Sequence, residues 1–215
     1  MLISDKDLKK IQKDLTCFDD VRDKVFDASR VATKLSGWSI VQMHRNEVEN
    51  AENTLRQVRD KLAQIDDLLK KAPELKQSGS VMVAHQEYAE AMLLHGLLKE
   101  RRLASLREVG VESTPYILGI LDLIGELRRA TLNHLRKGRA DDADETLKTM
   151  EELYENVLTL DHTAIVPTFR VKADAARRII ESTRGDVITE IRRLSLEEAI
   201  RALNAEVKKR SSTLT

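Results

Sequence analysis

Apolar residues recur every three or four positions along most of the chain, which is the spacing of one face of an α-helix. From Val21 to Leu35 this period continues until Gly37 interrupts it, and it returns from Ile40 to Leu69. Runs of β-branched or aromatic residues, which favour strands, are rare. The pattern therefore predicts an all-α chain of about seven helices.

Capping and helix-breaking residues suggest where these helices begin and end. In the first half we expect a helix from Ser4 to about Leu15, a second from Asp19, an arm over residues 40–71 and its end at Pro73. Gly37 or His44-Arg45-Asn46 could each interrupt the arm, and the pattern leaves both open. In the second half we expect one helix from about Val81 to Arg107 and another from Ser113-Thr114-Pro115 to about Gly138. Two further helices are expected on either side of Pro167, and a capping box at Ser195-Leu-Glu-Glu198 is expected to begin the last helix.

Composition limits the domain organisation and the compartment. A chain of 215 residues with 41% apolar residues can bury a core, and with 3 Pro and no linker, residues 1–215 are predicted to form a single domain with a frayed basic tail over about 208–215. The net charge is zero, so no polyanion partner is indicated by the whole molecule. The single Cys17 and the lack of a signal peptide or membrane-spanning run predict a cytoplasmic protein without a membrane partner.

Two pairs of acidic residues are candidates for chemistry. Glu87 and Glu90 are spaced i, i+3, and Asp122 and Glu126 are spaced i, i+4, so on helices each pair projects from one face. Two such faces packed together would crowd four carboxylates, which is tolerable only if a hard cation such as Mg²⁺ neutralises them or some protonate. Acidic pairs at these spacings are also common on solvated helix faces, as expected at Glu49/Glu52, Asp141/Glu145 and Glu151/Glu155.

The surroundings of the second pair differ from those of a solvated pair. Residues 116–127 are apolar all round the helix apart from the two acids, which is typical of a buried helix. Gly119 and Gly125 share a stripe with the acids and would let a neighbouring helix approach closely. A functional site and a buried structural network both remain open on this pattern.

Two segments of the sequence resemble one known family. Gln86-Glu-Tyr-Ala-Glu-Ala91 resembles the Gln-Glu-Tyr-Val-Glu-Ala stretch of translin-associated factor X, the partner of translin in an RNA-processing complex. Residues 116–129 resemble its Tyr-Leu-Leu-Gly-Val-Ala-Asp-Leu-Thr-Gly-Glu-Leu-Met-Arg segment, and this second motif is the more specific. In the N-terminal arm, Arg22-Asp23 followed by Ser29-Arg30 is similar to the factor X segment Arg-Asp-x-x-x-x-Ser-Lys-Arg, although the stretch before His44-Arg45 is longer here.

The resemblance implies a translin-like, single-domain bundle of about seven mostly long antiparallel helices. It also implies a homo-oligomeric closed shell and membership of the catalytic, factor X-like branch. The acidic metal-binding residues of that branch fall on Glu87, Glu90, Asp122 and Glu126. It further implies an endoribonuclease that cuts single-stranded RNA with Mg²⁺, or Mn²⁺ in its place, whereas the translin branch binds RNA without cutting. Candidate contacts to the nucleic acid are Arg30, Arg45 and Arg129.

The mechanism we expect is hydrolysis by metal-activated water, without a histidine base. Asp122 and Glu126 would be direct ligands, Glu87 a ligand or bridge, and Glu90 a ligand or the group that orients water. Arg129 either contacts phosphate or pairs with one of the acids. The alternative function is a non-catalytic helical scaffold that binds single-stranded RNA or DNA, and the sequence does not distinguish RNA from DNA.

Other chemistries lack their motifs. No histidine follows a glutamate by three residues, as a ferritin-like di-iron bundle requires. There is no phosphate-binding Gly-x-x-x-x-Gly-Lys-Ser/Thr loop and no Gly-x-Ser-x-Gly nucleophile elbow. One Trp, 3 Phe and 3 Tyr provide few surfaces for base stacking, so strong recognition of base sequence is not expected.

Overall fold

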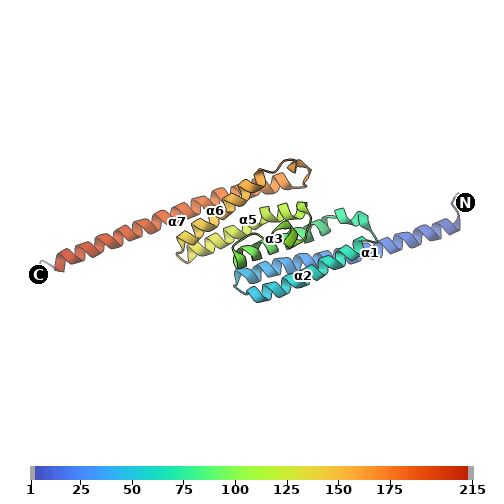
Figure 1. Cartoon of the computed structure of the whole chain (residues 1–215), viewed down its shortest axis with the longest axis horizontal. Coiled ribbons are helices and arrows are strands. Elements are labelled where there is room, and N and C mark those ends of the chain that lie inside the picture. Colours follow the sequence, from blue (N-terminus) through green and yellow to red (C-terminus); the bar gives the residue numbers. More distant parts are fainter. Residues whose placement is uncertain (1–2, 213–215) are drawn as a thin grey trace. The chain divides into compact units, whose positions relative to one another are not determined.

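The computed structural model describes residues 3–212, with side chains described as far as residue 205. These residues form seven α-helices and two short 3-10 helices, without a strand, which confirms the all-α prediction (Figure 1). Contacts divide the chain into two compact units, unit 1 (Met1–Leu123) and unit 2 (Ile124–Thr215). The single-domain prediction therefore stays a prediction. No helix in the described part of the chain is long and apolar enough to span a membrane.

Helix α1 (Asp5–His44) is continuous over 40 residues, so the predicted end near Leu15 is wrong. Of the two interruptions left open, Gly37 does not break the helix. The predicted cap at Ser4 is confirmed, because its hydroxyl accepts from the backbone N–H of Asp7. The break falls instead after His44, where Asn46 has a positive φ of 62°, a conformation that asparagine tolerates better than most residues. One glycine costs only about 1 kcal/mol in a helix, which packing can outweigh.

Helix α2 (Val48–Leu69) follows after three residues and packs along α1 (Figure 1). Its buried side chains face α1 and α3, and the hydroxyl of Thr54 donates to the side chain of Gln42 at 2.8 Å to fix the hairpin. Each fully buried branched side chain contributes about 1.5–3 kcal/mol relative to exposure. The largest fully buried apolar side chains of unit 1 are Val25, Val58, Ile65, Tyr88, Leu93, Leu94 and Leu123.

Helix α3 (Gly79–Glu100) follows the short helix η1 (Pro73–Gln77) and ends earlier than predicted. Arg101 takes a left-handed conformation, with φ of 53°, and α4 (Leu106–Val109) begins at a capping box between Ser105 and Glu108. Arg102 donates two hydrogen bonds to Glu108, and with Ser105 it lowers the pKa of Glu108 to about 2. This local network ends α3 and starts a new helix, which the apolar pattern did not indicate.

Helix α5 (Ser113–Arg136) begins at Ser113, two residues before the predicted first position at Pro115. Residues up to Leu123 belong to unit 1 and the remainder to unit 2. The helix ends close to the predicted Gly138, which takes a positive φ of 69°.

Unit 2 contains the end of α5, α6 (Ala140–Leu158), the short helix η2 (Thr163–Ile165) and α7 (Phe169–Ser212). The predicted boundary at Pro167 is confirmed, because α6 and α7 lie on either side of it. The predicted helix start at Ser195 is wrong: α7 passes through it, and Arg193 pairs with Glu190 and Glu197 along the same helix. Of the tail predicted to fray, residues 213–215 lie outside the described residues.

Candidate functional site

Helices α3 and α5 come into close contact at Gly119 within unit 1. A Cβ atom placed on Gly119 would lie 2.9 Å from the Cβ of Ala89, 3.0 Å from the backbone nitrogen of Glu90 and 3.2 Å from the carbonyl oxygen of Gln86. Two of these atoms are backbone, so no side-chain movement could make room for a methyl group. Glycine is therefore required for α5 to approach the segment of α3 that carries the first acidic pair.

Asp122 lies one helical turn after Gly119 and contacts α3 through its carboxylate. The side-chain amide of Gln86 donates to Oδ2 of Asp122 at 2.6 Å. Gln86 is buried and Asp122 half-buried, so the bond is partly shielded from water. A neutral amide orients the carboxylate without adding charge.

Glu90 is the only aspartate, glutamate, lysine or arginine that is buried among residues 3–205, with 8% of its surface exposed. Burying a carboxylate is costly unless it is hydrogen-bonded, paired, protonated or bound to a metal. Glu87, three residues earlier on α3, is half-buried. The first acidic pair is therefore not an ordinary solvated pair, unlike Glu49, Asp141 and Glu145, which are exposed.

Glu126 belongs to unit 2. It lies one turn after Asp122 along α5, and its side chain is 24% exposed. The guanidinium of Arg129 approaches its carboxylate to 3.8 Å, and Arg129 is 53% exposed. A pair this long and this exposed contributes little free energy. Of the two roles left open for Arg129, pairing with an acid has a contact in the structure.

The carboxylates do not gather into a closed cage. In the part of the chain that the structure describes, no group of three or more histidine, cysteine, aspartate or glutamate side chains is arranged to hold a metal ion. Mg²⁺ does not require such a cage, because it is usually bound by one or two carboxylates together with waters and substrate phosphates. Hard oxygen donors at Asp122 and Glu90, one of them oriented by an amide, fit that mode of binding. The metal-binding role of the four acids stays a prediction.

The two remaining candidate arginines lie on α1 or just after it. Arg30 is exposed, and its guanidinium is 3.3 Å from the carboxylate of Asp27. Arg45 caps the C-terminus of α1 and lies over the ring of Trp38, 5.5 Å from its centroid, in a cation–π contact. Trp38 is 46% exposed, so this contact is open to solvent. The structure does not bring Arg30 and Arg45 together with the acids by any described contact.

The sequence compares clearly with one family of known proteins. The model of the Translin family matches residues 20–182. The chain belongs to the translin family. All four acidic candidates, as well as Gln86 and Gly119, lie inside the matched region.

Individual relatives agree with this assignment. The chain is 30% identical over 188 residues to the uncharacterized protein MJ0175 of Methanocaldococcus jannaschii, covering 85% of this chain and 82% of that protein. It is 25% identical over 195 residues to Translin-associated protein X of Mus musculus, covering 72% of this chain and 67% of the relative. Its fold is similar to the structure of AfC3PO in complex with duplex RNA, with a TM-score of 0.77, 27% identity and coverage of 87% and 98%. The predicted translin-like fold and the predicted resemblance to the factor X branch are confirmed.

Two contacts of this translin-family chain were missed from the sequence. Gln86 was not singled out, although it precedes Glu90 by four residues and so shares a helix face with it. Its bond to Asp122 joins positions 36 apart, which no local pattern indicates. The contact of Arg45 with Trp38 was also missed; the seven-residue spacing, two helical turns, was the available signal.

Proposed function

We propose that this translin-family chain is a metal-dependent endoribonuclease that cuts single-stranded RNA, with Glu87, Glu90, Asp122 and Glu126 as its acidic residues. One observation carries the proposal most directly. At the close contact of α3 with α5, a buried carboxylate at Glu90 lies on the helix whose Gln86 binds Asp122. Its similarity to Translin-associated protein X supports the enzymatic branch.

The residues of this chain would divide the work as follows. Asp122 and Glu126 would hold Mg²⁺, or Mn²⁺ in its place, with Glu87 and Glu90 as further ligands or as the group that orients water. Gln86 would fix the direction in which Asp122 presents its oxygen atoms. The burial of Glu90 would strengthen its attraction for a cation. When bound, the metal would activate water and neutralise charge on the scissile phosphate.

Arg129 would exchange partners when RNA binds. Its distance of 3.8 Å from Glu126 and its exposure mean that little free energy holds it there. A phosphate group, which accepts two parallel hydrogen bonds from a guanidinium, would compete successfully. Arg30 and Arg45 would contribute further phosphate contacts. These contacts carry no information on base sequence, which agrees with the scarcity of aromatic residues.

RNA is the substrate class we favour because AfC3PO, which has the same fold, was solved with duplex RNA. A homo-oligomeric closed shell is the assembly we propose. Both ends of the chain carry apolar side chains that are exposed in the single chain. They are Leu8, Ile11 and Leu15 on α1, and Ile188, Ile191, Leu196, Ile200 and Leu203 on α7. Such stripes on long helices are typical of surfaces covered by another chain.

A cleavage assay tests the proposal. The purified chain would be incubated with end-labelled single-stranded RNA, duplex RNA and single-stranded DNA, each with Mg²⁺ or with a chelator. We expect Mg²⁺-dependent internal cleavage of single-stranded RNA that leaves 5′-phosphate and 3′-hydroxyl ends. Products with a cyclic phosphate would contradict water as the nucleophile.

Variants then connect cleavage to the site. We expect Asp122→Asn and Glu126→Gln to abolish cleavage while RNA binding, measured by fluorescence anisotropy, is kept. Asp141→Asn removes an exposed acid on α6 and is the matched control, expected to cut as the unchanged chain does. Retained cleavage in both site variants would remove these acids from the mechanism.

A non-catalytic RNA- or DNA-binding scaffold is the second candidate. The observation in its favour is that, among the described residues, the acids form no closed metal cluster. Under this function the Gln86 bond to Asp122 would be purely structural. Binding of RNA without cleavage under every metal condition would favour the scaffold.

A further inference from the structure

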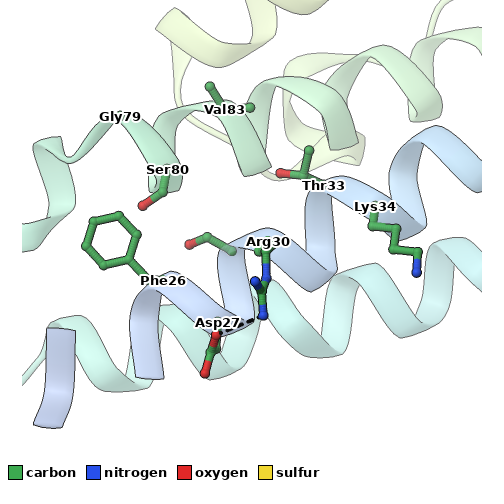
Figure 2. A pocket seen from close by; sticks show the side chains of 9 residues that line it. Phe26, Asp27, Arg30, Thr33, Lys34, Gly79, Ser80 and Val83 are labelled. Atoms are coloured by element: carbon green, nitrogen blue, oxygen red, sulfur yellow. Dashed lines mark hydrogen bonds and ion pairs between the residues drawn. The ribbon is translucent and has the colours of Figure 1, made fainter. Parts of the chain in front are cut away.

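A cavity of about 620 Å³ opens between α1 and the first turn of α3, on a part of unit 1 that the acidic site does not use. Figure 2 shows the residues that line it. Phe26, Asp27, Arg30 and Lys34 come from α1, and Ser80 comes from α3. The side chain of Ser80 points toward α1, whereas the guanidinium of Arg30 is turned toward Asp27.

The first turn of α3 presents backbone donors to this cavity. Gly79 and Ser80 both line it, and they are the first two residues of a helix of 22 residues. The first N–H groups of a helix have no partner within the helix and carry the positive end of its dipole. Ser78 occupies the N-cap position without accepting a side-chain capping hydrogen bond, and the first turn contains no acidic residue. The hydroxyl of Ser78 lies 3.4 Å from that of Ser80 instead. The first backbone donors of α3 are therefore open to an anion.

A second and independent feature lies on the opposite wall. Ser29 lines the same cavity, is only 1% exposed, and its hydroxyl has no hydrogen-bond partner among the described residues. Leaving a buried hydroxyl without a partner is unfavourable, so such a group indicates a ligand that the chain alone does not supply. By contrast, the buried hydroxyl of Ser39 on the same helix donates to the carbonyl oxygen of Ser36 at 2.7 Å.

The charges around the cavity match an anion. Arg30 and Lys34 contribute two positive charges and Asp27 one negative charge, and the helix end adds partial positive charge. The pair of Arg30 with Asp27 is 3.3 Å long, with side chains 83% and 75% exposed, so it contributes little and Arg30 can turn toward a ligand. Phe26 and Val83 add apolar lining to the cavity.

We propose that this cavity is a phosphate-binding site, in which the first N–H groups of α3 and the hydroxyls of Ser29 and Ser80 hold the oxygen atoms of one phosphate group. Arg30 and Lys34 balance its charge from the rim. The phosphate comes either from a nucleic acid or from free inorganic phosphate. The site needs no metal ion and no cleavage, so it stands whether or not the proposed nuclease activity does.

Inorganic phosphate is the probe that tests the site. The full chain would be titrated with phosphate in the presence of a chelator, and binding followed by ³¹P line broadening. We expect saturable binding that Ser29→Ala weakens by about tenfold, because a hydrogen bond to a charged group is lost. Ser39→Ala, on the same helix, is the control and should leave the affinity unchanged.

Double variants that remove positive charges give a second test of phosphate binding. Arg30→Gln and Lys34→Gln together should weaken phosphate binding by about tenfold or more. Arg22→Gln and Lys24→Gln together are the matched control. Arg22 also pairs with an aspartate three residues earlier on α1, and neither residue lines the cavity. Circular dichroism would show that all variants keep their helices.

Equal phosphate affinity in the unchanged chain, Ser29→Ala and the Arg30/Lys34 double variant would overturn the proposal, as would an absence of saturable binding. The source of the phosphate is decided by anisotropy with labelled RNA in chelator. If the double variant also binds RNA about tenfold more weakly, a nucleic acid supplies the group. If RNA binding is unchanged while phosphate binding is lost, the site takes free phosphate. Neither result depends on whether Asp122→Asn abolishes cleavage.

Discussion

Replacing Gly119 with alanine perturbs the contact on which the acidic site depends. The new Cβ would lie 2.9 Å from the Cβ of Ala89 and 3.0 Å from the backbone nitrogen of Glu90. Real Cβ atoms do not approach other atoms so closely, so α5 must shift away from α3. The hydrogen bond of 2.6 Å from Gln86 to Asp122, one turn further along α5, would lengthen. Gly119→Ala should therefore reduce both stability and cleavage.

The magnitude follows from two opposing contributions. Overpacking of a closely packed contact costs about 1–3 kcal/mol, whereas alanine is favoured over glycine in a helix by about 1 kcal/mol. Gly37→Ala, in α1 of the same unit, supplies the control because no atom lies within 4 Å of its added Cβ. It should stabilise the chain by about 1 kcal/mol. The helix preference cancels between the two variants, which should differ by about 2 kcal/mol, the overpacking cost alone.

Thermal unfolding followed by circular dichroism measures this difference. At about 2–4 °C per kcal/mol for a chain of this length, Gly119→Ala should melt about 4–8 °C below Gly37→Ala. Urea unfolding checks the comparison, since a chain of two units need not unfold in one step. If Gly119→Ala melted at or above Gly37→Ala, helices α3 and α5 would not be in close contact, and the geometry of the site would be refuted.

Three further changes test other parts of the account. Gln86→Leu keeps the side-chain volume but removes the amide that holds Asp122. The Mg²⁺ concentration for half-maximal cleavage should therefore rise by about tenfold. An unchanged concentration would show that this hydrogen bond has no role in the site. Lys99 lowers the pKa of Glu52 below 4.5, so the ion pair stabilises the chain above that pH and less as the pH falls. Glu52→Gln should accordingly melt below the unchanged chain at pH 7, with a gap that closes under acid conditions; a constant gap would refute the assignment. Ile11→Glu places a charge on the exposed stripe of α1 and should lower the assembled mass measured by light scattering, whereas an unchanged mass would exclude that stripe from the interface.

The helical class and most elements could be predicted because they depend on local spacing. Apolar period, the cap at Ser4 and the boundary at Pro167 each report on a few neighbouring residues. The errors have two causes. Tertiary packing outweighs the effect of some helix-breaking residues, and local hydrogen-bond networks end or start helices without a signal in the apolar spacing. Gly37 does not interrupt α1, and the Glu198 predicted to close a capping box with Ser195 lies inside α7.

For the acidic site, the sequence predicts only the residue types and their spacing along the helices. Glu90 is buried because α3 packs into unit 1. Its apolar neighbours are compatible with burial, but they do not show which face of the helix packs against α5. Two contacts depend on how α3 and α5 are placed relative to each other. They are the hydrogen bond from Gln86 to Asp122 and the close approach of α3 to Gly119. That the hydroxyl of Ser29 lacks a hydrogen-bond partner in the described part of the chain could not be predicted either. The helical period predicts that Ser29 is buried, but it does not predict which groups of other helices lie next to its hydroxyl.

Metal binding itself tests the central claim most directly. Mn²⁺, which can stand in for Mg²⁺ at oxygen sites, loses its sharp paramagnetic resonance signal when it binds, so free metal can be measured in a titration of the chain. We expect the unchanged chain and the Asp141→Asn control to bind Mn²⁺ equally, and Glu90→Gln and Asp122→Asn to leave most of it free. Equal binding by all four proteins would contradict the claim that the carboxylates of α3 and α5 form a metal site.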